Sequence, residues 1–385
     1  MAGPVRPASE PISGGWRQVP ALAAPITVYA ARAPRPVAGL PVHTAGFVSA
    51  TTGWAAVGSY TPPSFALLRT EDGGVTWTSQ LAWPGTRPWQ LQPFDTQQAA
   101  LVFGLWPTVA NVINGQPVAA GQPPHPFLAG TQDAGQTWTL RSPPDPQAGG
   151  VHFLSPAEIW VLISVPGAYP RTDAARSADG GASWSRVDGA GDLPLIRVRF
   201  FSPRDGMLIA EDRLRADILY RTSDGGHTWN RQHLAPPPRL PPGAMTQLYP
   251  VGPDLLMLSA VSPTHPASRP RPRWEGSYGY QQTKDGWADP IRLPMPPADN
   301  GPDLLVPAPD RRLWGGCGHD LWVSDDLAGP WRHLPVPLPD EEHISGICPV
   351  GDGVLWIVTN TGVAGGGLYR SDDGAHWNRL TVAAT

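Results

Sequence analysis

A short phrase recurs along the chain and constrains the fold more than any other feature. Its clearest copy reads TSDGGHTW and runs from Thr222 to Trp229. Three close copies begin at Thr70, Thr131 and Ser177. Three degenerate copies begin at Thr283, Ser324 and Ser371. A phrase that returns at intervals of about 40–60 residues indicates a repeat architecture.

The phrase predicts a tight turn that closes a β-hairpin. The Ser or Thr hydroxyl and the Asp carboxylate accept hydrogen bonds from nearby backbone N–H groups. The Gly two places after the Asp supplies a positive φ, and the Trp covers the turn with apolar surface. Strand-like runs such as 65–69 and 218–221 precede the phrase. The predicted structural residues of the seven turns are Thr70, Asp72, Gly74, Trp77, Thr131, Asp133, Gly135, Trp138, Ser177, Asp179, Gly181, Trp184, Thr222, Asp224, Gly226, Trp229, Thr283, Asp285, Trp287, Ser324, Asp326, Trp331, Ser371, Asp373 and Trp377.

The pattern Ser/Thr-x-Asp-x-Gly-x-Thr/Ser-Trp resembles the Asp-box, also called the BNR repeat, from about residue 42 to 382. Similar repeats occur in sialidases, other glycoside hydrolases, sortilin-type receptors and the photosystem II assembly-factor family, which share a β-propeller. The resemblance implies an all-β fold: a seven-bladed β-propeller of four-stranded antiparallel blades. In each blade the Asp-box hairpin turn would join the third and fourth strands.

The repeats also predict the domain organisation. Residues 1–41 are expected to be an N-terminal lead-in, with a possible closing strand at 16–20. Residues 42–385 are expected to form the propeller, as one closed ring and a monomer. The predicted blades span about 42–80, 91–141, 151–187, 195–234, 245–293, 303–334 and 343–382.

Two long intervals between boxes predict insertions in the second and fifth blades, on the face away from the boxes. Binding residues concentrate on loops that a rigid scaffold presents. The fifth-blade insertion, 262–276, brings together Arg271, Arg273, Trp274 and Glu275, with Tyr278 following. Arginine beside aromatic side chains suits carboxylates, phosphates, sugars or a partner protein. The commoner alternative for such a sequence is a solvated Pro-rich loop.

Three further groups have both a functional and a structural interpretation. Trp106 and His125, at the second-blade insertion, suit carbohydrate stacking or the packing of the loop on itself. Arg197 and Arg199 alternate with apolar residues and suit a basic binding site. Pairing of these arginines with acids such as Asp205 or Glu211 is the favoured alternative. The run 340–343, Asp-Glu-Glu-His, suits acid–base chemistry or a solvated turn.

The repeat phrasing resembles the photosystem II assembly-factor family more closely than the sialidases. Phe47, then Gly53-Trp54, then the run from Arg69 to Trp77 follow that family's order. Its members act by binding. Sialidases usually begin with an aromatic-Arg-Ile-Pro motif, for which Ala33-Pro34-Arg35-Pro36 is a poor substitute. No catalytic residue is therefore carried over from the sialidases.

The composition limits the kinds of partner that the protein is expected to bind. The net charge is −4 without a basic block, which gives no electrostatic footprint for nucleic acid. No apolar run approaches the ~18 residues that span a membrane, and no metal or cofactor motif occurs. The two cysteines, Cys317 and Cys348, suit either a disulfide or two buried thiols. A convincing signal peptide is lacking, so the chain as written is expected to be cytoplasmic, or exported if a signal precedes it.

These observations predict a non-catalytic propeller scaffold that binds a protein or glycan partner on the face opposite the Asp-boxes. The alternative is a glycoside hydrolase of sialidase-like propeller type acting from the same face. A pair of carboxylates ~5–10 Å apart would favour the hydrolase. An exposed aromatic patch without such a pair would favour the scaffold.

Overall fold

The computed structural model describes most of the chain between Leu40 and Ala383 and three short segments before it. The described residues are 12–13, 16–19, 26–29, 40–60, 63–84, 86–105, 112–113, 116–117, 125–145, 148–165, 171–187, 194–211, 217–238, 240, 244–262, 273–295, 304–351, 353–361 and 365–383. All regular elements in these residues are β-strands, and these residues contain no helix long and apolar enough to cross a membrane. The chain forms two compact units: unit 1 is Met1–Leu22 with Ala148–Leu293, and unit 2 is Ala23–Gln147 with Pro294–Thr385.

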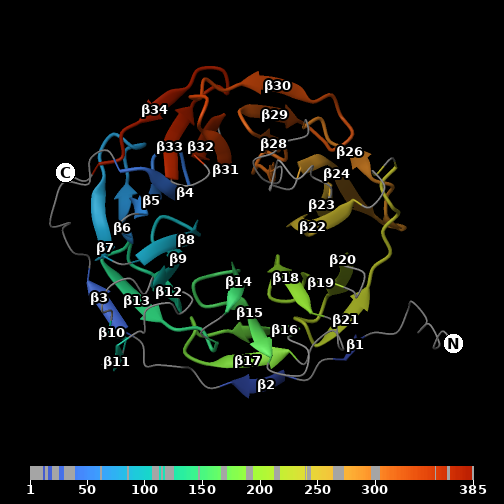
Figure 1. The fold of residues 1–385 in the computed structure, drawn as a ribbon, viewed down its shortest axis with the longest axis horizontal. Coiled ribbons are helices and arrows are strands. Elements are labelled where there is room, and N and C mark those ends of the chain that lie inside the picture. The colour runs from blue at the N-terminus through green and yellow to red at the C-terminus, as the bar shows by residue number, and fades with distance from the viewer. Residues whose placement is uncertain are drawn as a thin grey trace, which may run out of the picture. The chain divides into compact units, whose positions relative to one another are not determined.

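Unit 1 contains three antiparallel sheets (Figure 1). The first is made of β14 (Gly149–Phe153), β15 (Ile159–Val165), β16 (Arg171–Ser177), β17 (Trp184–Val187) and β2 (Trp16–Val19). The second is made of β18 (Leu195–Phe200), β19 (Gly206–Glu211), β20 (Asp217–Thr222), β21 (Thr228–Arg231) and β1 (Ile12–Ser13). The third is made of β22 (Met245–Gly252), β23 (Leu255–Ser262), β24 (Arg273–Thr283), β25 (Gly286–Trp287) and β26 (Ile291–Arg292).

Unit 2 contains two smaller sheets, a large one and a hairpin. One sheet is made of β8 (Thr86–Pro93), β9 (Ala99–Leu105), β12 (His125–Thr131), β13 (Thr137–Arg141) and β3 (Ile26–Tyr29). Another is made of β27 (Leu304–Pro307), β28 (Leu313–Cys317), β29 (Asp320–Ser324) and β30 (Arg332–Pro335). The large sheet is made of β31 (His343–Gly351), β32 (Val354–Asn360), β33 (Gly365–Ser371), β34 (Asn378–Leu380), β4 (Val42–Phe47), β5 (Gly53–Tyr60), β6 (Pro63–Thr70) and β7 (Thr78–Pro84). The hairpin pairs β10 (Val112–Ile113) with β11 (Gln116–Pro117).

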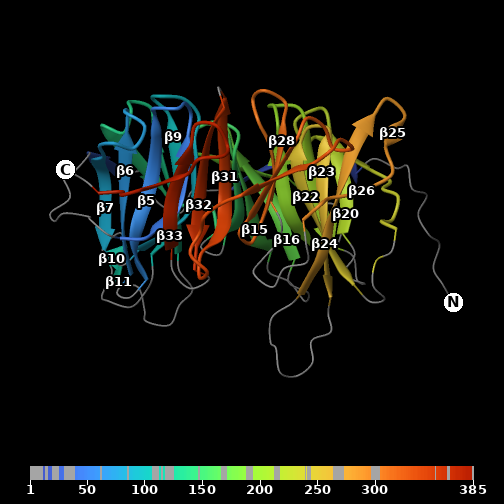
Figure 2. The ribbon, with the colours of Figure 1, turned by 90° about the horizontal axis from the view of Figure 1, so that it is seen from above.

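The prediction of seven separate four-stranded blades is wrong. The structure has five separate blade sheets, three in unit 1 and two in unit 2. The strands predicted for the first and last blades belong instead to one eight-stranded sheet, in which β31, β32 and β33 lie side by side (Figure 2) and β33 pairs with β4. Three of the separate sheets also gain a fifth strand from the N-terminal region, β1, β2 or β3. The all-β class and the antiparallel pairing are as predicted.

A run of glycines explains why two predicted blades share a sheet. Gly366 of β33 pairs with Val42 of β4. A Cβ atom at Gly365 would lie 2.4 Å from the Val42 carbonyl oxygen, and one at Gly366 would lie 2.4 Å from Oγ1 of Thr359. The backbones approach this closely because glycine has no side chain. Glycine contributes nothing to an apolar–polar pattern, so the sequence pattern does not reveal the junction.

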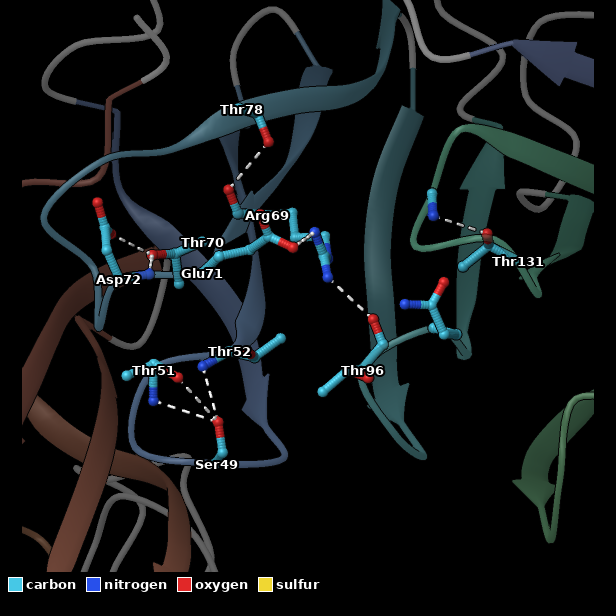
Figure 3. Close-up of polar contacts among 12 residues, drawn as sticks. Ser49, Thr51, Thr52, Arg69, Thr70, Glu71, Asp72, Thr78, Thr96 and Thr131 are labelled. Atoms are coloured by element: carbon cyan, nitrogen blue, oxygen red, sulfur yellow. Dashed lines mark hydrogen bonds and ion pairs between the residues drawn. The ribbon is translucent and has the colours of Figure 1, made fainter.

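The repeated turn has the predicted hydrogen bonds, of which Figure 3 shows the one between Thr70 and Asp72. In the first copy the N–H of Gly74 donates to Oγ1 of Thr70 at 2.9 Å, and the Thr70 hydroxyl donates to Oδ1 of Asp72 at 2.9 Å. The N–H and hydroxyl of Thr76 donate to the two oxygens of Asp72, at 2.9 and 2.6 Å. These bonds lower the pKa of Asp72 to about 2, the Thr76 hydroxyl contributing most. The same bonds recur in the copies that begin at Thr131, Ser177 and Thr222.

The glycine and the tryptophan of each close copy also behave as predicted. Gly226 has a φ of 90°, and the matching glycines of the other three copies are also positive. The four tryptophans are at most 1% exposed: Trp77, Trp138, Trp184 and Trp229. In the degenerate copies the tryptophans are only partly buried: Trp287, Trp331 and Trp377. In the last copy the imidazole of His376 replaces the second hydroxyl, with Nδ1 2.6 Å from Oδ2 of Asp373.

Each close copy is tied to the turn between the first and second strands of its own sheet. The N–H of Gly73 donates to the carbonyl of Thr51, and the N–H of Gly225 donates to that of Arg204, at 2.9 and 2.8 Å. The copies at Thr131 and Ser177 have the equivalent bond. The repeated turn therefore lies at the strand ends opposite the connection between the second and third strands.

Aromatic rings and arginines link neighbouring sheets, or separate strands of one sheet, inside each unit. In unit 1 the ring of Phe200 stacks on Trp160 with centroids 3.7 Å apart, and in unit 2 Phe47 stacks on Trp356 at 3.6 Å. Arg69 lies over the Trp54 ring at 5.1 Å, and its Nη2 donates to the Thr96 carbonyl of the next sheet at 2.9 Å (Figure 3). At these contacts, stacking and cation–π attraction add to the stabilisation that burial of the aromatic rings provides.

Candidate functional site

The sheets are built from groups of four successive strands, and the first strand of each group is distinctive because it lacks acidic residues. We call β4, β8, β14, β18, β22, β27 and β31 the lead strands. None of them contains Asp or Glu. Their ionisable side chains that carry or can take up positive charge are His43, Arg87, His152, Arg197, Arg199 and His343. Within each unit, these strands supply no carboxylate that would offset the positive charge of their arginines, which favours anions near those arginines.

Unit 1 brings the largest group of these side chains together, and we call it the arginine site. It consists of His152 on β14, Arg197 and Arg199 on β18, and Gln247 and Tyr249 on β22. The Cζ atom of Arg197 lies 4.2 Å from the centre of the Tyr249 ring. The Tyr249 hydroxyl donates to Oε1 of Gln247 at 2.6 Å. The Tyr249 ring is thereby held under the guanidinium of Arg197.

Arg199 is fixed by the backbone of the neighbouring sheet. Its Nη1 donates to the Pro250 carbonyl at 2.8 Å, and its Cζ lies 5.6 Å from the Phe201 ring. Arg199 keeps exposed surface, although partial burial of its guanidinium lowers the pKa of Arg199. The expected pairing of Arg197 and Arg199 with Asp205 or Glu211 is wrong: among the described residues, their contacts are with aromatic rings and a carbonyl. Asp205 instead accepts a hydrogen bond from Ser202.

His152 is neutral at physiological pH. Its Nε2 donates to the Phe200 carbonyl at 2.7 Å. Burial lowers the pKa of His152 to about 4, and the nearby charge of Arg199 acts in the same direction. The positive charge of the arginine site therefore comes from the two arginines, and His152 joins β14 to β18.

Most other residues predicted for a binding site lie elsewhere or outside the described residues. Trp106 and Arg271 lie outside them, and only the backbone of His125, Arg273, Trp274 and Glu275 is described. Tyr278 is 4% exposed and packs in the core, where its hydroxyl donates to the Pro238 carbonyl at 3.1 Å. The arginine site is therefore not joined to the fifth-blade insertion by any described side chain.

The acidic run at 340–343 contains a buried carboxylate that is already fully engaged. Glu342 is 3% exposed. Its Oε1 accepts from Nη2 of Arg379 at 2.6 Å, and its Oε2 accepts from the hydroxyls of Tyr369, at 3.0 Å, and Thr359. Burial and this carboxylate raise the pKa of Tyr369 to about 12. Glu342 therefore stabilises the packing of unit 2 and does not present a catalytic pair.

Cysteine and metal chemistry are also limited in the described part of the chain. Cys317 and Cys348 are not joined by a disulfide, and Sγ of Cys348 donates to the Phe47 carbonyl at 3.4 Å. Burial raises the pKa of the Cys348 thiol, which lowers its reactivity. No cluster of three or more His, Cys, Asp or Glu side chains placed to hold a metal ion occurs among the described residues.

Antiparallel sheets that follow one another along the chain, several closed by the same turn, define the β-propeller class. No family model and no curated protein matches the chain. Among solved structures, YCF48 from Cyanidioschyzon merolae is 15% identical over 92% of this chain and 98% of its own, with a TM-score of 0.50. The GH74 xyloglucanase from Xanthomonas campestris is 16% identical over 94% of this chain and 56% of its own, with a TM-score of 0.52.

A second YCF48 structure, bound to a D1 peptide, is 18% identical over 94% of this chain and 86% of its own, with a TM-score of 0.39. At these levels of identity the first two similarities establish the fold alone. They show that the chain has a β-propeller fold. The same fold occurs in a carbohydrate hydrolase, so function has to be argued from the site.

Proposed function

We propose that the protein is a non-catalytic β-propeller scaffold that binds an acidic segment of a protein partner at the arginine site. The observation that carries this proposal is the absence of Asp and Glu from all seven lead strands, together with two arginines held by an aromatic ring and a carbonyl. Guanidinium groups bind carboxylates with two parallel hydrogen bonds. The close copies of the turn, with their shared bonds, support their assignment as Asp-boxes.

The position of the arginine site along the strands modifies the predicted docking face. Arg199 precedes by one residue the end of β18, where the chain turns beside the repeated turn. Arg197 lies nearer the middle of that strand. The proposed partner therefore runs along the lead strands of unit 1 and is not confined to the strand ends away from the repeated turns.

The alternative, a glycoside hydrolase, has less support. Most enzymes of this kind use two carboxyl groups that flank the scissile bond. The lead strands contain no carboxyl side chain, and both carboxylate oxygens of Glu342 already accept hydrogen bonds from Tyr369 and Arg379. Turnover of a chromogenic glycoside by the purified protein, abolished by substitution of an Asp or Glu, would overturn the scaffold proposal.

The test of the scaffold proposal is a peptide-binding measurement. A fluorescein-labelled peptide of alternating Glu and Gly is expected to bind, and its Lys counterpart is not. Arg197→Gln and Arg199→Gln should each weaken binding about tenfold, the loss expected for one charge-assisted contact. Added salt should weaken binding as well, because exposed charges are screened.

Arg204→Gln is the matched control, since Arg204 is exposed in the turn after the same strand. It removes the same charge and should leave the affinity unchanged. An equal loss in Arg204→Gln would show that only net charge matters. Failure of the acidic peptide to bind the wild-type protein would contradict the proposal directly.

A further inference from the structure

Trp89 on lead strand β8 is an exposed indole in unit 2. Its side chain is 43% exposed, and it is the single exposed tryptophan among those whose side chains the structure describes. Four of the others, in the repeated turns, are at most 1% exposed. An exposed tryptophan leaves a large apolar surface in water, and the backbone around Trp89 shows how that surface is kept there.

Two backbone features hold the ring at the surface. The pairing of β8 with β9 shifts register between Pro88 and Gln90, so Trp89 is the extra residue of a β-bulge. Bulges re-aim side chains and are enriched beside functional sites. A Cβ atom at Gly104 of β9 would lie 2.4 Å from Cζ2 of the indole, so the ring occupies the space above a glycine.

Polar side chains share this side of the sheet. Gln90 and Gln92 pair across the strands with Val102 and Ala100, whereas Leu91 lies in the apolar core on the other side. Gly104, beneath the indole, is on the same side as Val102 because side chains alternate along a strand. Both glutamines are half-buried, and neither side chain has a hydrogen-bond partner among the described residues. Trp89, Gln90 and Gln92 therefore form one amphipathic surface.

We propose that Trp89, Gln90 and Gln92 form a binding site for the neutral pyranose rings of a glycan. The apolar C–H face of a pyranose covers an indole of this size, and each amide offers both a donor and an acceptor to hydroxyls that need both. A Pro-rich peptide offers only carbonyl acceptors and docks between several aromatic rings. The described part of this surface has one exposed ring, which favours the sugar. The site is independent of the arginine site in unit 1.

The test is calorimetric titration with cellopentaose and maltopentaose, with a proline-rich peptide as the competing ligand. One of the two oligosaccharides should bind the wild-type protein. Trp89→Ala should lower its affinity at least tenfold, Trp89→Phe less, and Gln90→Ala and Gln92→Ala severalfold each. Val75→Ala is the control, because Val75 is 80% exposed in a repeated turn of another sheet. The Val75→Ala variant should bind the oligosaccharide with the affinity of the wild-type protein.

Chemical modification gives a readout that does not depend on folding of a variant. N-bromosuccinimide should oxidise Trp89 before the other described tryptophans, and the bound oligosaccharide should protect it, as peptide mass mapping would show. Unchanged affinity in Trp89→Ala, or oxidation of Trp89 unaffected by saturating sugar, would overturn the proposal. Binding of the proline-rich peptide alone, or of no ligand, would do the same. Arg197→Gln should bind the oligosaccharide normally, so this proposal and that of the peptide-binding scaffold fail separately.

Discussion

Single hydroxyl groups organise the repeated turns. The Thr70 hydroxyl donates to Asp72 and accepts from the N–H of Gly74, so one oxygen satisfies groups on both sides of the turn. All these partners lie within a few residues in the sequence. This is why the pattern of hydroxyl, carboxylate and glycine was enough to predict the turn. Tyr249 and the Pro250 carbonyl, which contact Arg197 and Arg199, are in another sheet, and local sequence carries no signal for these contacts.

His152 gives a pH prediction at the same scale. The folded pKa, about 4, is below the ordinary value of 6.5, so the unfolded chain binds the proton more tightly. The contribution of His152 to stability should be constant above pH 6.5, become unfavourable as the pH drops from 6.5 towards 4, and change no further below pH 4. The loss from this group is at most about 3 kcal/mol. Urea unfolding at neutral and acidic pH measures it.

His152→Gln should reduce this acid-side loss, because the amide can still donate to Phe200 and does not titrate. The decrease will be partial, since burial also lowers the pKa of His43 and His343. His376→Gln is the control: the pKa of exposed His376 is raised by Asp373, so its titration has the opposite sign. An acid-side loss that is identical in wild type and His152→Gln would contradict the assignment.

At the scale of strands and sheets, the structure differs from the prediction in the pairing of β33 with β4. The strands themselves, their antiparallel pairing and the position of the repeated turns followed from local pattern. The blade count did not, because it depends on a backbone contact between the two ends of the repeat region. The strands β1, β2 and β3 are a similar case, since short segments pair with any exposed edge that is near them.

The glycine junction gives a prediction for this scale. Gly365→Ala should lower the free energy of unfolding by about 1–3 kcal/mol, because the new Cβ overlaps the Val42 carbonyl. Gly130→Ala is the matched control: Gly130 also lies in a strand, β12, and its Cβ would meet nothing within 4 Å. It should change the stability by less than about 0.5 kcal/mol. Equal effects in urea unfolding would show that glycine flexibility, and not the close approach, matters.

At the scale of the whole molecule, the N-terminal strands stabilise sheets whose other strands come much later in the sequence. Strand β2 pairs with β17 and β1 pairs with β21, both in unit 1. Removal of Met1–Leu22 should leave the other pairings of that unit intact, because β17 and β21 also pair with β16 and β20. The melting temperature should fall slightly.

Hydrogen exchange measured by mass spectrometry would locate the effect of this truncation. Faster exchange is expected at Trp184–Val187 and Thr228–Arg231, and exchange in β27 to β30 of unit 2 should stay the same. Unchanged exchange at β17 would show that β2 does not protect its edge. A general increase in both units would show that the N-terminal segment is needed for folding as a whole.

The junction between β33 and β4 also sets an order of events during synthesis. The ribosome makes β4 long before β32, yet Phe47 at the end of β4 stacks on Trp356 of β32. Until then the nascent chain displays an aromatic ring and a strand edge without their partners. Such surfaces are what chaperones hold and what drives aggregation of incomplete chains. The large sheet of unit 2 is therefore completed only after β33 has been made.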